Sequence, residues 1–378
     1  MKRQILNINL SSNQTHIISI DWLRGILALL IVTYHYSSWQ QLFIPDSNSI
    51  LSRIAIYGVS LFFIISGFSL GYTYLKKFNQ LTLKKIKSFY FKRIARIYPL
   101  YWLIIFLSLI IGYRHIKDIG SIENFFLQIS LTFDFFNYDG LTPGSWSIGV
   151  EIIMYTIFPF IIFFTNLSTK ANLSVTIFIY IFIIVILMYI SSYHAPYQYH
   201  NLSFFKTQYF SSYVHFFINH LYFFLFGILF ALVYINYKSH WYTRIHFYIT
   251  SIIFVSALLI LFLYKLDGNA LGLIIIHKER VIFSLITFAI FIFFLSLNSY
   301  IKLISVRINK LLSFLGDISY TIYLIHPLAF YQYKKSIYIE SLGIYNFVLF
   351  IILLLLLSKY IHYSYELKIK KLLLKVML

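Results

Sequence analysis

Long apolar runs separated by short polar segments repeat along almost the whole chain. A helix needs about 20 consecutive apolar residues to cross a bilayer. Ten runs of roughly that length are predicted, near residues 18–39, 53–75, 97–114, 146–165, 173–193, 213–235, 245–264, 281–300, 311–332 and 344–362. The pattern predicts an all-α integral membrane protein, a bundle of about ten transmembrane helices that forms one domain over residues 1–378.

The basic residues between the runs predict the orientation of the bundle. Lys and Arg collect on the cytoplasmic side of membrane proteins. The segment between the second and third runs, residues 76–96, is rich in both and contains no acidic residue. Counting alternately from that segment places both termini in the cytoplasm, as an N-terminal segment over residues 1–17 and a basic tail over residues 363–378.

Composition narrows the chemistry. Hydrophobic residues make up 60% of the chain and charged residues 11%, which excludes an ordinary soluble domain. The net charge of +19 is spread between apolar runs, so nucleic acid is not an expected partner. The chain has no cysteine, and neither a zinc signature nor a phosphate loop occurs, so no metal is expected.

Two outer segments, residues 115–145 and 194–212, are longer than simple connectors, and the first could lie on the surface or re-enter the bundle.

The first run, with the sequence DWLRGILALLIVTYHY over residues 21–36, carries three ionisable side chains. Arg24 and His35 are eleven residues apart, so on a helix they lie about 20° from the same face and roughly 16 Å apart along the axis. Asp21 lies one turn from Arg24. Ionisable residues inside spanning helices usually mark function; Arg suits anion binding and His suits proton transfer near neutral pH. Alternatively, Arg24 reaches lipid headgroups and His35 bonds a neighbouring helix.

The third and fourth runs carry further charged residues. Arg93 and Arg96 lie one turn apart in FKRIARIYPLYW and can face one site, although the positive-inside signal alone could explain them. Glu151 lies about one turn into the fourth run, with Ser147 and Tyr155 on its face of the helix. Glu151 could orient an imidazole, hold a sugar hydroxyl, or bond helices together.

Two other runs carry small or polar residues whose role the spacing leaves open. Ser66 and Gly67 in FFIISGF form a small patch suited to close helix packing. In ISYTIYLIHP, Tyr323 and His326 lie along one stripe, and Pro327 frees the carbonyl of Tyr323 from its helical hydrogen bond. His326 could be a structural residue beside a kink or a catalytic one.

Taken together, these motifs resemble the acyltransferase-3 family of bacterial integral-membrane O-acyltransferases. The matching strings are DWLRGILALLIVTYHY, FFIISGF, FKRIARIYPLYW, SWSIGVEIIMY and ISYTIYLIHP, in the order of the family from residue 21 to about residue 330. The resemblance therefore covers nearly the whole chain, in the stand-alone form without a fused extracytoplasmic hydrolase-like domain. It implies a multi-pass protein of the bacterial plasma membrane, with membrane lipids around it.

The resemblance also implies a reaction. Members transfer an acyl group, usually acetyl, from coenzyme A in the cytoplasm to a hydroxyl of a cell-envelope glycan or glycolipid. His35 is then expected to be the catalytic base, with Arg24 as its partner and Glu151 as the family's membrane-embedded acid. Ser66 and Gly67 match the family's Ser-Gly-Phe segment. The residues expected to contact the phosphates of acetyl-CoA, or of another acyl-CoA, are Arg93, Arg96 and Lys92.

Two other functions are weighed against this reaction. The main alternative is a transporter or flippase for polysaccharide or lipid-linked sugar, in which His35, Glu151 and Asp317 form a proton relay. That class often shows paired inverted repeats, which the sequence does not display. A non-catalytic assembly subunit is the third possibility, and the charged stripe on the first run argues against it.

Overall fold

The structure, a computed structural model, describes residues 16–42, 45–114, 121–133, 140–142, 144–193, 217–237, 241, 243–268, 274, 277–336 and 343–377. Throughout these ranges the regular elements are helical, which confirms the all-α prediction. Among the described residues, ten helices are long and apolar enough to cross a membrane, the number that the apolar runs predict. The predicted outer segment 194–212 lies outside the described residues.

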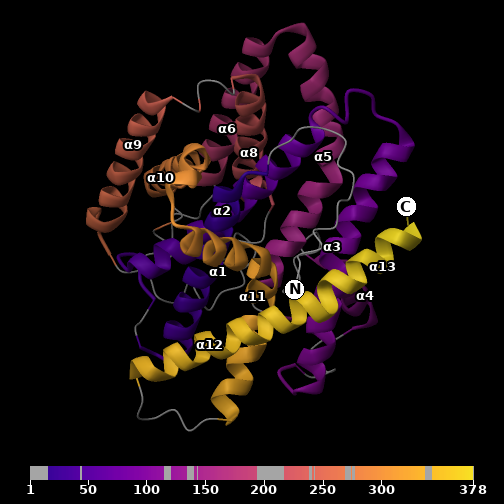
Figure 1. The fold of residues 1–378 in the computed structure, drawn as a ribbon, viewed down its shortest axis with the longest axis vertical. Coiled ribbons are helices and arrows are strands. Elements are labelled where there is room, and N and C mark those ends of the chain that lie inside the picture. The colour runs from indigo at the N-terminus through magenta and orange to yellow at the C-terminus, as the bar shows by residue number, and fades with distance from the viewer. Residues whose placement is uncertain are drawn as a thin grey trace.

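The long helices form a bundle (Figure 1). Their bounds are α1 (Ile18–Trp39), α2 (Ile50–Tyr74), α3 (Leu83–Ile110), α5 (Ser145–Ala171), α6 (Leu173–Tyr193), α8 (Ile218–Asn236), α9 (Arg244–Leu263), α10 (His277–Leu297), α11 (Val306–Ser336) and α12 (Gly343–Ile361). Helix α12 runs across the other helices of the bundle at an angle. A 3₁₀ turn, η6 (Asn298–Leu303), follows α10. Helix α9 lies at the edge of the bundle, and most of its large apolar side chains are exposed, as expected for a lipid-facing helix.

Helix α3 begins at Leu83, well before the predicted run that starts near residue 97. The basic segment is therefore helical itself, and the side chain of Thr82 caps it by accepting a hydrogen bond from the Lys85 backbone N–H at 3.4 Å. Pro99 lies inside this helix and does not end it. As a result, Arg93 and Arg96 lie on a continuous helix that can direct both side chains to one side.

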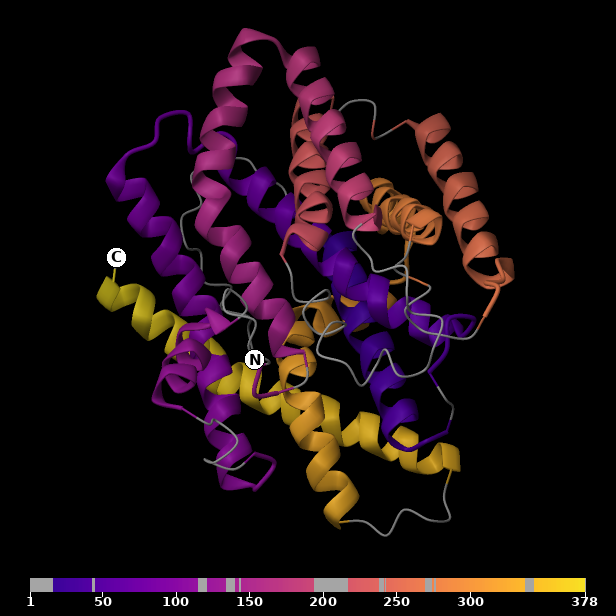
Figure 2. The same cartoon turned by 180° about the vertical axis from the view of Figure 1, so that it is seen from behind.

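The predicted tail over residues 363–378 is also helical in its described part, up to Met377. A π-helical turn, η7 (His362–Glu366), joins α12 to α13 (Leu367–Met377). In Figure 1, α12 and α13 cross one face of the molecule as one long rod, and Figure 2 shows this rod on the far side of the bundle. Helix α13 packs on α3, because it alternates Leu and Ile with Lys and so has an apolar side.

Glycines bring the central helices unusually close. A Cβ atom on Gly67 of α2 would lie 2.1 Å from the carbonyl oxygen of Phe224 on α8, so any larger residue would collide with the α8 backbone. A Cβ atom on Gly316 of α11 would lie 2.4 Å from the carbonyl oxygen of Asp21 on α1. Small residues at such crossings let membrane helices pack by close van der Waals contact. The two crossings join α1, α2, α8 and α11 at the centre of the bundle.

The short helix α4 (Ile122–Ser130) lies against the middle of α3 rather than beyond its end. The Tyr98 hydroxyl donates to the Ser130 carbonyl at 2.8 Å, and Trp102 Nε1 donates to the Ile129 carbonyl at 3.0 Å. Ile122 and Phe126 are exposed, so the described helix of the 115–145 segment lies on the outer surface of α3. Residues 115–120, 134–139 and 143 lie outside the described part.

Candidate active site

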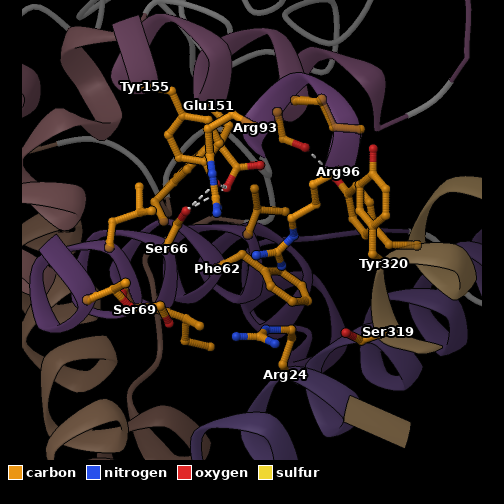
Figure 3. A pocket seen from close by; sticks show the side chains of 18 of the residues that line it. Arg24, Phe62, Ser66, Ser69, Arg93, Arg96, Glu151, Tyr155, Ser319 and Tyr320 are labelled. Carbon is orange, nitrogen blue, oxygen red and sulfur yellow. Dashed lines mark hydrogen bonds between the residues drawn. The ribbon is translucent and has the colours of Figure 1, made fainter. Parts of the chain in front are cut away.

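A cavity of about 180 Å³ lies between α1, α2, α3, α5 and α11. Most of the side chains that the sequence singled out line it, namely Arg24, Ser66, Arg93, Arg96, Glu151 and Tyr323. In Figure 3 the guanidinium groups of the three arginines turn toward the same space, Arg24 from α1 and Arg93 and Arg96 from α3. The cavity therefore concentrates positive charge inside an otherwise apolar bundle, where a charge interacts more strongly than in water.

The two arginines on α3 are held differently. Arg93 lies over the rings of Tyr155 and Phe89, with its guanidinium carbon 5.8 and 5.9 Å from their centroids, and its buried Nε has no hydrogen-bond partner in the described part of the chain. Arg96 makes neither a hydrogen bond nor an ion pair with any described residue. Both guanidinium groups therefore have donor capacity left for an anion.

Glu151 is the one carboxylate among the described residues that line the cavity. Its Oε1 accepts hydrogen bonds from the Tyr155 hydroxyl, one turn along α5, and from Ser66 Oγ on α2, at 2.6 Å. Ser66 Oγ also lies 2.7 Å from the Tyr155 hydroxyl. The sequence correctly predicts the contact with Tyr155. Ser147, the other residue predicted on that face, instead lies with its Oγ 2.8 Å from the Tyr323 hydroxyl.

Arg24 is the one cavity arginine with a carboxylate partner in the described structure. Its Nη1 donates to Asp21 Oδ1 at 3.1 Å, one turn away on α1. Asp21 Oδ2 also lies 2.8 Å from His16 Nε2, just before the helix. This hydrogen bond to Asp21 raises the pKa of His16 above its ordinary value. Asp21 therefore anchors Arg24 without lining the cavity itself.

His35 does not line the cavity but lies one layer beyond it, paired with His326. His35 Nδ1 lies 2.9 Å from His326 Nε2, and the two rings are inclined by only 14°. The indole of Trp39, one turn further along α1, stacks on His35 with the centroids 4.8 Å apart. No described residue hydrogen-bonds His35 Nε2. The structure thus fixes one edge of the His35 ring and leaves the other edge available.

The ring of Tyr323 lies between the cavity and His326 and packs on Phe62. Phe62 of α2 and Tyr323 of α11 both line the cavity, with their ring centroids 5.8 Å apart. The ring of Tyr323 is in turn 6.1 Å from that of His326. Tyr323 therefore contacts both the cavity and the histidine pair.

Two further predicted residues, Lys92 and Gly67, belong neither to the cavity lining nor to the histidine pair. Lys92 is not among the cavity-lining residues, because its position on α3 is one residue away from Arg93 and so points in another direction. Gly67 takes part in the close packing on α8 described above and leaves the neighbouring Ser66 to face Glu151. The packing interpretation of Gly67 is therefore confirmed.

The cavity also contains residues that the sequence analysis missed. Ser69 and Thr73 line it and follow Ser66 at intervals of three and four residues, a helical spacing that was visible in the sequence. Tyr320 also lines the cavity. Outside the cavity, Trp39, which stacks on His35, could have been found by the same helical spacing, because it lies four residues after His35.

The chain was then compared with known proteins. The model of the acyltransferase-3 family, described as an acyltransferase domain, matches residues 17–363. The searches among curated proteins and among solved structures returned no match. The matched range includes every residue of the cavity and both paired histidines. The chain therefore belongs to the acyltransferase-3 family and is a multi-pass membrane acyltransferase.

Proposed function

We propose that this acyltransferase moves an acyl group, expected to be acetyl, from acyl-CoA to a hydroxyl of a cell-envelope glycan or lipid-linked sugar. The observation that carries the proposal is the convergence of Arg24, Arg93 and Arg96 on one cavity, whose lining residue Tyr323 contacts the partner of His35, His326. An anion site beside a proton-transfer group is what transfer from a phosphate-bearing thioester requires.

The donor is proposed to enter from the basic end of the bundle. The charge pattern predicts that both termini and the 76–96 segment lie in the cytoplasm of a bacterium, where acyl-CoA is made. Arg93 and Arg96 would hold its phosphates, because guanidinium groups bind phosphate with paired, charge-assisted hydrogen bonds. The acyl end would then extend past Phe62 and Tyr323 toward the histidine pair.

His35 is proposed to act as general base on the acceptor. Its Nε2 would take the proton from the acceptor hydroxyl while the oxygen attacks the thioester carbonyl. As the C–S bond breaks, the same nitrogen returns a proton to the leaving thiolate. In a second version the acyl group passes first to His35 and then to the acceptor. Both versions need an unoccupied His35 Nε2, which agrees with its lack of a described partner.

The transporter alternative finds less support. Its proposed relay needs His35, Glu151 and Asp317 to exchange protons. His35 bonds His326, Glu151 bonds Ser66 and Tyr155, and Asp317 is exposed on α11, so the described hydrogen bonds do not link the three.

Mass spectrometry of the cell-surface glycans tests the proposal. Cells that lack the gene are compared with the same cells carrying the wild-type gene or its His35→Ala variant. We expect the glycans to be present in all three strains, with the acyl group only in the wild-type strain. Glycans that are missing from the surface of the cells without the gene would indicate transport instead, and an acyl group restored by His35→Ala would refute the proposed base.

A further inference from the structure

The histidine pair begins at a backbone carbonyl that a proline has freed. Pro327 has no N–H, so the carbonyl of Tyr323, four residues earlier, has no backbone donor from that position. His326 Nδ1 lies 2.8 Å from this carbonyl oxygen. A carbonyl oxygen can only accept a hydrogen bond, so Nδ1 of His326 must carry the proton.

The protonation of His326 determines that of His35. A neutral imidazole carries one proton, so His326 Nε2 is left as an acceptor. It lies 2.9 Å from His35 Nδ1, which must therefore be the donor. The proton of neutral His35 is then on Nδ1, and the lone pair is on Nε2, the nitrogen without a described partner.

We propose that His326 is a positioning residue that holds His35 in the Nδ1–H form, so that Nε2 is the basic nitrogen. The inference rests on the proposed function in that it assigns the atom of His35 that would accept the substrate proton. His326 donates to the Tyr323 carbonyl, His35 donates to His326, and the substrate hydroxyl would donate to His35. The partner of a histidine commonly selects its tautomer and ring orientation in this way.

The pair also has a role once His35 has accepted the proton. The imidazolium of His35 donates its Nδ1–H to the lone pair of His326, so the new positive charge has an acceptor inside the bundle. The proton returned to the leaving thiolate comes from His35 Nε2, and both histidines recover their starting tautomers. Stacking of Trp39 on His35 keeps the ring in this plane.

Nitrogen-15 NMR tests the tautomer directly, without any reaction. The purified protein is labelled at the histidine ring nitrogens, placed in lipid nanodiscs above the ordinary histidine pKa, and His35 is assigned by its loss in His35→Gln. Protonated and unprotonated ring nitrogens resonate far apart. We expect Nδ1 of His35 to be protonated in the wild type. A wild-type His35 protonated on Nε2 would overturn the inference.

Kinetics test the consequence for turnover. His326→Leu removes the acceptor, whereas the side-chain oxygen of His326→Gln can take the place of Nε2. We expect kcat to fall about 10- to 100-fold in the Leu variant and to recover several-fold in the Gln variant, with KM for acyl-CoA unchanged. Phe330→Leu is the matched packing control. Phe330 lies one turn after His326 on α11 and packs on Trp39 of α1, 5.1 Å between ring centroids, with no ring contact to either histidine among the described residues.

Wild-type kcat in His326→Leu, or equal loss in the Leu, Gln and Phe330→Leu variants, would overturn the inference. Binding of coenzyme A, measured by calorimetry, shows whether each variant is folded. If the wild-type protein does not use acyl-CoA, the proposed function fails, but the NMR spectrum still decides whether His326 sets the tautomer of His35.

Discussion

Replacing Arg96 should weaken binding of the acyl donor more than replacing Arg24. Arg96 has no hydrogen-bond or ion-pair partner among the described residues, so its interaction with a phosphate does not require breaking an existing contact. Arg24, in contrast, is already bonded to Asp21 at 3.1 Å. We therefore predict a larger loss for Arg96→Gln than for Arg24→Gln.

The size of the effect follows from the type of bond. A hydrogen bond to a charged group contributes about 1.5–3 kcal/mol, which corresponds to a rise in Kd for coenzyme A of about 10- to 150-fold. The chemical step should change less, because Arg96 lies on the cavity side of Phe62 and Tyr323, away from the histidine pair. The loss should therefore appear in Kd and KM rather than in kcat.

Calorimetry with unacylated coenzyme A measures this Kd on protein in nanodiscs. Lys87→Gln is the matched control, because it removes the same charge from an exposed position on the same helix and should change Kd by about twofold at most at physiological ionic strength. An Arg96→Gln protein that binds coenzyme A as tightly as the wild type would refute the assignment of the cavity to the donor phosphates.

Three further predictions concern stability and protonation. Overpacking in Gly67→Ala should lower the free energy of unfolding by about 1–3 kcal/mol and so lower the melting temperature of the purified protein. Gly58→Ala, whose Cβ would meet only side-chain atoms at 3.5 Å or more, should leave the melting temperature unchanged. Glu366→Ala should lower the free energy of unfolding by about 1–3 kcal/mol, because the Thr321 hydroxyl at 2.7 Å and His362 Nδ1 at 2.8 Å lose their shared acceptor; an unchanged melting curve would contradict this. Asp21→Asn should bring the raised pKa of His16 back toward its ordinary value in an NMR titration. Because that pKa is raised, the stabilisation is present at acid pH and is lost as pH rises through the folded value, and its size is small since His16 is 74% exposed.

The helices that could be predicted from the sequence are those that consist of one long apolar run. The apolar runs predict the ten long helices, and α6 was predicted with its observed bounds. The start of α3 and the helical tail were not predicted, because their Lys-rich sequences resemble polar loops in a search for apolar runs. The tail helix α13 packs on α3, which is a tertiary interaction that the local pattern does not show.

The composition of the cavity was also partly predictable. The turn spacing of Arg93 and Arg96, and of Glu151 and Tyr155, correctly indicates residues that face one site. The spacing of Arg24 and His35 does not show where the cavity ends, because that boundary depends on residues from other helices.

The histidine pair illustrates the same limit. The freed carbonyl beside Pro327 can be read from the sequence, and so can a histidine one residue before the proline. Its pairing with His35 joins residues 291 positions apart. Such a contact depends on how α1 and α11 cross, and that crossing is set by the close approach at Gly316.

The most direct test of the account is the rate of acyl transfer from labelled acetyl-CoA by His35→Gln in a single-turnover experiment. We predict that the rate falls at least about 100-fold, the usual contribution of a general base, while Kd for coenzyme A stays within about twofold of the wild-type value. Transfer by His35→Gln at the wild-type rate, with donor binding intact, would contradict the central claim that His35 performs the chemistry and the arginine-lined cavity holds the donor.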